Sequence, residues 1–68
     1  MAERLANRIK ERRCDLDLTQ AGLAEMVGVT RKTVNTVENG VFTPSATLAI
    51  KLAQALGISV EQLFWIER

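Results

Sequence analysis

Apolar residues in the middle of the chain recur every three or four positions, which predicts two short helices separated by a tight turn. The apolar positions of this pattern are Leu23, Ala24, Val27, Val34 and Val37. Gly28 lies at the break, where a residue without Cβ adopts a positive φ at little cost. Thr30 follows as the candidate N-cap of the second helix, which Asn39 and Gly40 end. The predicted helix–turn–helix therefore spans residues 20–39.

The same kind of periodicity predicts three further helices. They cover residues 3–14, 45–57 and 59–64. Candidate N-caps along the chain are Thr19, Thr30, Ser45 and Ser59. In the first helix, Leu5 and Ile9 stand one turn apart and are expected to face the core. Pro44 disfavours helical backbone in the residue before it, so we expect a loop before the helix over residues 45–57. Together these segments predict an all-α fold of five helices in one domain, residues 1–68.

The outward face of the second central helix carries hydrogen-bond donors and small polar groups. Its members are Arg31, Lys32, Thr33, Asn35 and Thr36. No acidic residue precedes Glu38 in this helix. Such a helix suits the major groove of DNA, where Arg and Lys meet guanine and a threonine methyl meets the methyl of thymine. The alternative is an ordinary solvated face, which any short helix has.

Charge and composition narrow the classes of function. The 68 residues include 9 basic and 8 acidic side chains, a net charge of +1, which is low for a nucleic-acid-binding protein. The acids lie mainly outside the second central helix, so we expect a locally positive face on a nearly neutral body. With no histidine and a single cysteine, Cys14, the usual zinc sets, a Ser-His-Asp arrangement and an internal disulfide are excluded. We expect no metal, no cofactor and no catalysis.

The chain also lacks the sequence features of membrane or secreted proteins. No apolar run is long enough to span a bilayer, and the charged start, MAERLANRIKERR, is unlike a signal peptide. One unpaired cysteine fits a reducing compartment. We therefore expect a cytoplasmic protein without a membrane partner.

The central stretch resembles the helix-turn-helix of the Xre family, the lambda repressor and Cro-like (Cro/C1-type) regulators. The matching residues are Gln20, Leu23, Ala24, Gly28, Val34, Val37, Glu38, Asn39 and Gly40, followed by Pro44 and Ser45. In the family, Ala24 would be the small residue that lets the helices cross closely. Gly28 would be the turn glycine, and Val34 the apolar plug beneath the recognition helix. The resemblance implies a lambda-repressor-like, five-helix DNA-binding domain.

We assign the candidate DNA contacts on this basis. Base contacts are expected from Arg31, Lys32, Thr33, Thr36 and Asn35. Phosphate contacts are expected from Gln20, Thr30, Asn39 and Thr43, together with backbone N–H groups of the loop after Gly40. Phosphate contacts set the register on DNA without reading its sequence. Phe42, the aromatic residue of this loop, would lie either against the sugar-phosphate backbone or, as we favour, at the edge of the core.

Two arginines near the end of the first helix bear on its packing. Arg12 stands where the family usually has an aliphatic residue. Arg13 stands where the family often has an arginine paired with the glutamate of the E-N-G ending, here Glu38. We expect a partly buried Arg13–Glu38 ion pair between the first and third helices, which specifies geometry more reliably than it adds stability. The alternative is two ordinary surface charges.

The C-terminal segment, residues 60–66, is more apolar than chain ends usually are. Not all of its large side chains fit inside so small a domain, and an exposed apolar patch marks an interface. The ending resembles a compact subset of the family that dimerises through its C-terminal end. We expect a homodimer that uses Leu63, Phe64, Trp65 and Ile66, with part of this tail extended. Alternatively, Trp65 folds back over the first helix.

These expectations combine into one predicted function. The chain would bind double-stranded DNA as a homodimer on an inverted-repeat operator. It would regulate transcription in a prokaryote or phage, as a repressor does. Two recognition helices about 34 Å apart would read successive major grooves. The alternative is a protein-interaction or antitoxin-like module of the same fold, in which the apolar tail binds another, unknown protein and DNA binding is secondary.

Overall fold

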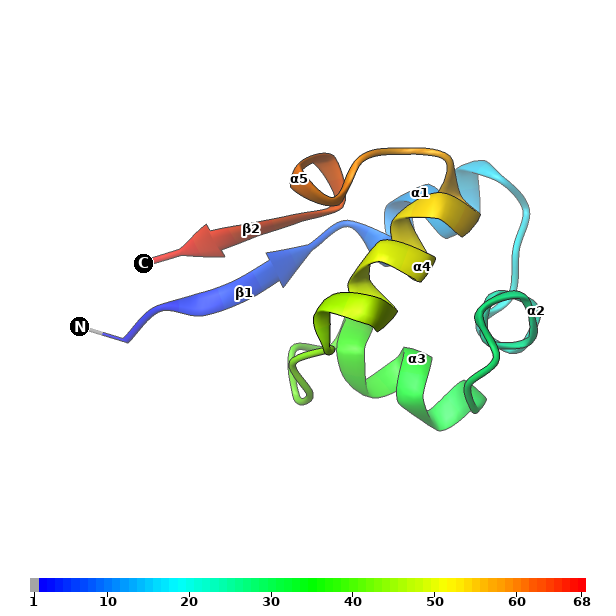
Figure 1. Cartoon of the computed structure of the whole chain (residues 1–68), viewed down its shortest axis with the longest axis horizontal. Coiled ribbons are helices and arrows are strands. Elements are labelled where there is room, and N and C mark those ends of the chain that lie inside the picture. Colours follow the sequence, from blue (N-terminus) through cyan, green and yellow to red (C-terminus); the bar gives the residue numbers. More distant parts are fainter. Residues whose placement is uncertain (1) are drawn as a thin grey trace.

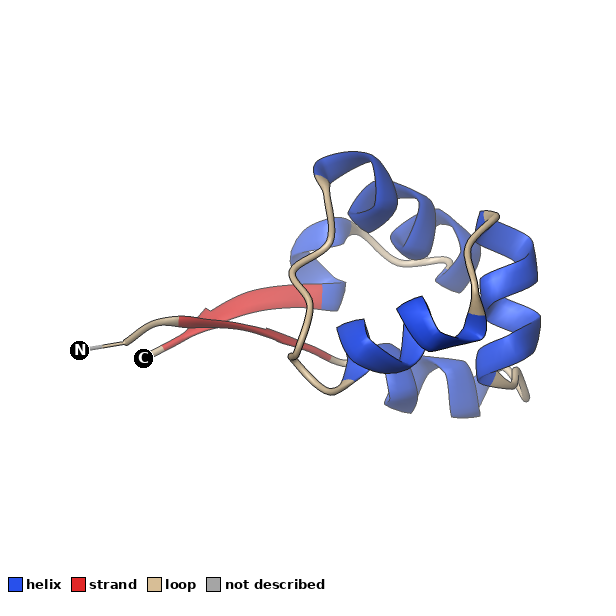
Figure 2. Cartoon of the chain, turned by 90° about the horizontal axis from the view of Figure 1, so that it is seen from below, coloured by secondary structure: helices blue, strands red, loops and turns tan. Residues whose placement is uncertain are grey.

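A computed structural model describes residues 2–68, and in this range five helices and two strands form one small body (Figure 1). The elements are β1 (Arg4–Asn7), α1 (Ile9–Asp15), α2 (Gln20–Val27), α3 (Arg31–Glu38), α4 (Ala46–Leu56), α5 (Val60–Leu63) and β2 (Phe64–Glu67). The helices pack around one another, and the two strands leave this helical body side by side, so that both ends of the chain lie together (Figures 1 and 2). The mainly helical, five-helix fold predicted from the sequence is confirmed.

The predicted first helix over residues 3–14 is wrong in its first half. Residues 4–7 form β1, and α1 begins only at Ile9, whose backbone N–H donates to the Asn7 side chain at 3.0 Å. Leu5 therefore lies on a strand and not on a helical face shared with Ile9. The spacing of two apolar residues does not distinguish a helix from a strand when the strand's partner lies at the other end of the chain.

The C-terminal end of the chain is extended, as we expected for part of the segment 60–66. β2 pairs antiparallel with β1 in the register Arg4–Glu67, Leu5–Ile66, Ala6–Trp65 and Asn7–Phe64. Because side chains alternate along a strand, two pairs lie on each face of this hairpin. The face that carries Phe64 is joined to the helices, since the Asn7 amide on the same face donates to the carbonyl of Val37 at 3.1 Å. We call this the inner face.

The predicted helix starts and the predicted turn are present. Side-chain oxygens of four residues accept a backbone N–H of the first helical turn, namely Thr19, Thr30, Ser45 and Ser59. Each such bond satisfies a donor that has no partner inside its helix. Gly28 ends α2 with φ 76°, in the left-handed region. The α2–α3 corner is thereby built as its sequence indicates.

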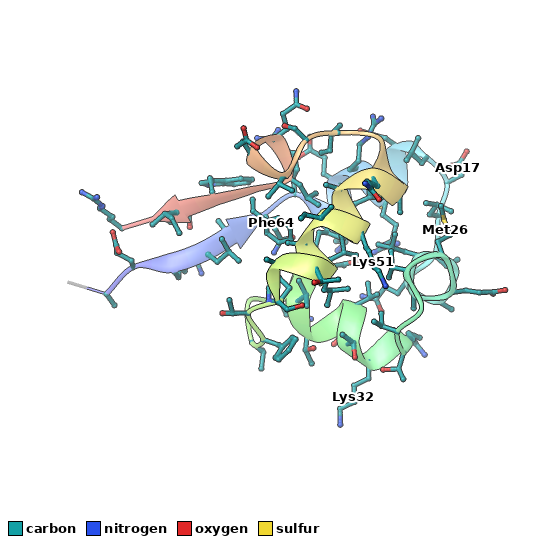
Figure 3. The ribbon with its side chains drawn as sticks, in the orientation of Figure 1. Asp17, Met26, Lys32, Lys51 and Phe64 are labelled. Atoms are coloured by element: carbon teal, nitrogen blue, oxygen red, sulfur yellow. The ribbon has the colours of Figure 1, made fainter. Side chains whose placement is uncertain are left out.

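The core lies between the helices and the base of the hairpin. Its buried residues are Ile9, Leu23, Ala24, Val27, Val34, Val37, Leu52, Ala53, Leu56, Leu63 and Phe64. Phe64 lies where the hairpin joins the helical body (Figure 3). The apolar faces of α2 and α3 are thus both covered, which leaves their polar faces for other contacts. No helix within residues 2–68 has the length and apolar character needed to cross a membrane.

Candidate nucleic-acid interface

Helix α3 presents a polar face because its apolar face is fully used in the core. Val34 and Val37 are both 2% exposed. Arg31, Lys32 and Asn35 are exposed on the other side, and Lys32 points away from the body (Figure 3). Such an amphipathic helix offers donor groups to a partner without disturbing its own packing.

A shallow notch joins this face to the start of α2. It has a volume of about 380 Å³ and is lined by Gln20, Arg31, Lys32 and Asn35. All four side chains donate hydrogen bonds, and none of them is acidic. The structure thus brings three candidate base contacts together with Gln20, one of the four candidate phosphate contacts. Among residues 2–68, moreover, no group of three side chains suited to holding a metal ion is found.

The two threonines of the candidate reading face are already hydrogen-bonded. The Thr36 hydroxyl donates to the carbonyl of Thr33 at 2.9 Å, and the Thr33 hydroxyl lies 3.0 Å from that of Thr30. Thr30 also caps α3 by accepting the backbone N–H of Thr33 at 3.2 Å. The half-buried Thr33 and Thr36 are therefore better suited to contact with an apolar methyl group than to a directional hydrogen bond.

The ion pair between Arg13 and Glu38 is present, so this prediction is confirmed. Arg13 Nε lies 2.9 Å from Glu38 Oε2, and Arg13 Nη2 donates to Glu38 Oε1 at 3.3 Å. The two side chains are only 12% and 5% exposed. The hydrogen bond to Glu38 raises the pKa of Arg13 above its ordinary value. Burial of the guanidinium acts in the opposite direction and has the smaller effect. Arg13 Nη1 also donates to the carbonyl of Leu18, which ties α1 to the connection before α2.

Gln20 joins this ion pair to the notch. Its amide nitrogen donates to Glu38 Oε1 at 3.3 Å. An amide nitrogen carries two hydrogens, so Gln20 keeps one for an acceptor outside the protein. The only carboxylate of α3 is thus turned inward and paired, and Arg31 and Lys32 are the charges that α3 exposes. The local positive charge expected from the sequence depends on this pairing, which the charge pattern alone does not show.

The loop after α3 differs from the expectation in one respect. The backbone N–H of Gly40 donates to the carbonyl of Val37 at 3.1 Å, and those of Val41 and Phe42 donate to the carbonyl of Thr36 at 2.9 and 3.2 Å. The expectation that backbone N–H groups of this loop meet phosphates is therefore wrong for these three residues, because α3 carbonyls already accept them. The exposed side chains of Asn39 and Thr43 lie at the two ends of this turn.

Phe42, which we expected at the edge of the core, is not among the residues that pack against the core. It lines a groove of about 200 Å³ together with Leu5, Pro44 and Phe64. Half of its surface remains exposed. Contact of the ring with a sugar-phosphate backbone therefore stays an alternative.

Two of the four residues predicted for the dimer interface are buried within the single chain. Leu63 is 0% exposed and Phe64 is 7% exposed. Neither side chain is free to contact another copy, so the assignment of these two residues is wrong, because α5 and the base of β2 complete the core themselves. Trp65 and Ile66 are more exposed, at 36% and 58%. The Trp65 ring lies under the guanidinium of Arg8, with the guanidinium carbon 5.0 Å from the ring centroid.

Arg12 has a role that the sequence did not reveal. Its Nε donates to the carbonyl of Leu56 at 2.8 Å, at the C-terminal end of α4. Helix ends leave carbonyls without partners, and a cation there also interacts favourably with the helix dipole. Where the family usually has an aliphatic residue, this chain therefore has an arginine that forms a polar contact between α1 and α4.

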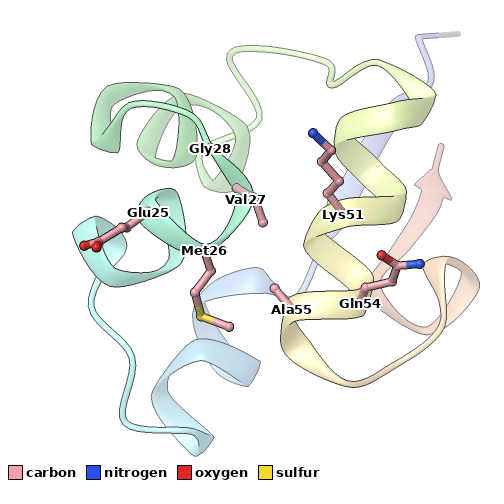
Figure 4. A pocket seen from close by; sticks show the side chains of 7 residues that line it. All are labelled: Glu25, Met26, Val27, Gly28, Lys51, Gln54 and Ala55. Carbon is pink, nitrogen blue, oxygen red and sulfur yellow. The ribbon is translucent and has the colours of Figure 1, made fainter.

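A second hollow lies between α2 and α4, away from the candidate reading face (Figure 4). It has a volume of about 560 Å³ and includes Glu25 and Met26 on one side and Lys51 on the other. None of the residues predicted for DNA contact lines it. Substitutions here serve below as controls for substitutions at the candidate interface.

Comparison with known proteins agrees with this architecture. A family model described as helix-turn-helix matches residues 9–63. The chain is 41% identical over 63 residues to YgzD, an uncharacterized helix-turn-helix-type transcriptional regulator of Bacillus subtilis, covering 93% of this chain and 96% of that protein. It is 47% identical over 60 residues to a regulator of the same description from Methanothermobacter thermautotrophicus, covering 87% of each.

Solved structures show the same likeness. The P22 c2 repressor, crystallised with a synthetic operator, superposes with a TM-score of 0.77 at 33% identity, over 79% of this chain and 82% of that one. The restriction-modification controller protein C.AhdI of Aeromonas hydrophila superposes with a TM-score of 0.79 at 38% identity, over 84% and 86%. Both of these curated relatives are described as transcriptional regulators. This chain belongs to the Cro/C1-type helix-turn-helix family of transcriptional regulators.

Proposed function

We propose that this chain binds double-stranded DNA in a sequence-specific manner as a homodimer, with α3 in the major groove, and regulates transcription from an inverted-repeat operator. The observation that carries the proposal is the notch formed by Gln20, Arg31, Lys32 and Asn35, whose neighbouring carboxylate, Glu38, is buried in an ion pair. The likeness to a repressor crystallised with its operator supports it.

Three of the four side chains that line the notch suit base edges. Arg31 and Lys32 suit the O6 and N7 acceptors of guanine, and Asn35 suits the N6 and N7 edge of adenine. Arg31 and Asn35 stand four residues apart, on one face of α3 and about 6 Å apart along its axis. The two would therefore read bases a short distance apart in one half-site. Thr33 and Thr36 would add contact with thymine methyl groups.

Phosphate contacts would hold α3 in register. Gln20 offers its second amide hydrogen at the start of α2, while Asn39 and Thr43 offer exposed side chains after α3. Thr30 also remains in this set, through its position at the start of α3. These contacts bracket the reading face at both ends, as positioning contacts do in protein–DNA complexes. A regulator of this kind would act where the chromosome lies, in the cytoplasm of a prokaryote.

The proposal is tested by selection from fragmented genomic DNA with the purified protein at near-physiological salt, followed by sequencing. We expect an inverted repeat whose half-site centres lie about one helical turn apart. An Arg31→Ala, Asn35→Ala double variant should not enrich this repeat, although it should stay folded because both side chains are exposed. Recovery of unrelated fragments, with binding that vanishes as salt rises, would show only general attraction to phosphate and would contradict the proposal.

A further inference from the structure

Asn7 joins α3, the helix that carries the candidate reading face, to two other elements through one side chain. It is the last residue of β1 and lies, half-buried, on the inner face of the hairpin. Its amide nitrogen donates to the carbonyls of Val37 and Glu38 at 3.1 and 3.4 Å. Its amide oxygen accepts the backbone N–H of Ile9 at 3.0 Å. A single amide group therefore binds the last two residues of α3 and the first residue of α1.

The two helix ends that Asn7 binds need partners from outside their own helices. The first turn of a helix leaves backbone N–H groups without partners, and the last turn leaves carbonyls. Arg8, the N-cap of α1, supplies no side-chain hydrogen bond, whereas the N-caps of α2 to α5 do. Asn7 takes that place for α1, and its amide hydrogens serve the end of α3.

Hollows flank this bridge on both sides. One is the groove of about 200 Å³ that Phe42 and Pro44 line, and the other, of about 230 Å³, is lined by Asn39 and Trp65. Asn7 lines both of them. Because open space lies on either side of the amide, the end of α3 has room to move once the amide is removed.

The other supports of α3 act elsewhere on the helix. Its start is held by the short corner after α2, and its apolar face is held in the core. The Arg13–Glu38 ion pair holds a side chain near its end. Asn7 binds the backbone of the last turn itself, so it fixes the tilt of α3 about its start.

We propose that Asn7 is a positioning residue for DNA reading, whose amide fixes the tilt at which α3 enters the major groove. This inference rests on the proposed function and adds to it a residue that does not itself touch DNA. An eight-residue helix is about 12 Å long, so a tilt of about 5° around its start moves its end by roughly 1 Å. A binding site has to be held within about 0.5 Å of its productive geometry. After such a tilt, Arg31 and Asn35 could not meet their bases while Asn39 keeps its phosphate.

Asn7→Asp separates the two functions of the amide. The carboxylate is nearly the same size and still accepts from Ile9, since aspartate caps helices as well as asparagine does. It has no hydrogen to donate to the carbonyls of α3, so the bridge is lost. Gln54→Glu makes the same chemical change at an exposed position of α4, away from the candidate DNA contacts. Ser59→Ala removes the cap of α5 and controls for lost stability.

Specificity is the measurement that a merely structural role would not change. Each protein binds a duplex with one half-site of the selected operator and a scrambled duplex, at a temperature where circular dichroism shows it folded. A single half-site keeps the association of two chains out of the result. We expect the ratio of the two affinities to fall about tenfold in Asn7→Asp, which is the size of effect that loss of one base contact has. Gln54→Glu and Ser59→Ala should keep the wild-type ratio.

Amide hydrogen exchange tests the bridge without DNA. The backbone N–H groups of Asn39 and Gly40 donate to carbonyls of α3. Local opening of the last turn exposes them, so both should exchange about tenfold faster in Asn7→Asp than in the wild type. The N–H of Leu23 in α2 should be affected no more than it is by Ser59→Ala.

Three results would overturn the inference. The first is an unchanged affinity ratio in Asn7→Asp. The second is an equal fall in Gln54→Glu, which would assign the effect to the added charge, and the third is an equal fall in Ser59→Ala, which would assign it to stability. If the wild type itself prefers no sequence, the proposed function fails and Asn7 has no reading to support. Faster exchange in Asn7→Asp would then still show that the amide holds the end of α3.

Discussion

At the scale of single residues, Glu38 matters most for the surface that α3 presents. A carboxylate near the reading face would repel phosphate if it were exposed. Here Arg13 neutralises it, Gln20 donates to it, and its side chain is only 5% exposed. The same residue thus holds α1, α2 and α3 together and removes negative charge from the surface of α3.

We expect Glu38→Ala to destabilise the fold strongly, because it leaves the Arg13 guanidinium buried without its partner. Loss of one member of a buried pair typically costs about 3–5 kcal/mol. For a domain of this size that corresponds to a fall in Tm of roughly 12 °C or more. Thermal unfolding followed by circular dichroism measures it, with Glu25→Ala, an exposed glutamate of α2, as the control. A shift as small as that of Glu25→Ala would mean that the pair adds nothing.

Arg31 is the residue of the notch whose contribution to specificity is most readily measured. If it reads a guanine, Arg31→Ala should cost about 1–3 kcal/mol of binding free energy and relax the preference at one base pair only. Lys51→Ala removes a similar charge from α4, away from the notch, and should leave that preference intact. Competition binding with single-base variants of the operator measures both. An equal loss on every sequence would instead identify a phosphate contact.

At the scale of elements, the orientation of α3 depends on a short corner. Gly28 adopts φ 76°, and the backbone N–H of Val29 donates back to the carbonyl of Ala24 at 3.0 Å. Thr30 then starts α3 immediately. Because α2 and α3 each span eight residues, a small change at this corner moves every side chain of the reading face.

Gly28→Ala tests this corner by backbone strain alone. A Cβ at this position would meet no atom within 4 Å, so only the left-handed φ opposes it. We expect a loss of about 1–2 kcal/mol in the free energy of unfolding. Gly22→Ala within α2 is the contrast, since its backbone is helical and its Cβ would meet side-chain atoms alone, the Thr19 hydroxyl oxygen at 3.2 Å and Leu18 Cδ2 at 3.9 Å. Urea unfolding compares the two, and a loss no larger at Gly28 than at Gly22 would contradict the strain argument.

At the scale of the whole molecule, the chain is small enough for a partner copy to matter for its stability. A domain of about 60 residues buries only about 60% of the surface that its unfolded chain exposes. The hairpin adds apolar surface without covering all of it, since Ile66 and Phe42 are at least half exposed. Self-association would therefore be expected to stabilise the folded state.

We accordingly predict that the Tm of the wild-type chain rises with protein concentration, because dimerisation favours the folded state by mass action. Ile66→Glu should melt at a temperature independent of concentration, and Met26→Glu should follow the wild type. Differential scanning calorimetry at several concentrations measures this. A concentration-independent Tm for the wild type would argue against a dimer that contributes to stability.

Much of the fold and of the candidate site follows from local sequence. The caps Thr19, Thr30 and Ser45 act within three residues of themselves, and the apolar spacing of Val34 and Val37 determines which side of α3 faces water. Such features depend on neighbours in the chain, so they are readable before the fold is known. The Arg13–Glu38 pair was expected only through resemblance to a family, because no local pattern joins residues 25 positions apart.

Only the tertiary structure decided the features that join distant segments. Residues 4–7 form a strand because their hydrogen-bonding partners lie near the C-terminus, 63 positions away for Arg4 and Glu67. For the same reason Leu63 and Phe64 proved to be core residues and Arg12 proved to bind the end of α4. The sequence by itself determined α2 to α5 and the polar surface of α3, since both arise from local periodicity. The hairpin arises from contacts between the two ends of the chain, which periodicity does not encode.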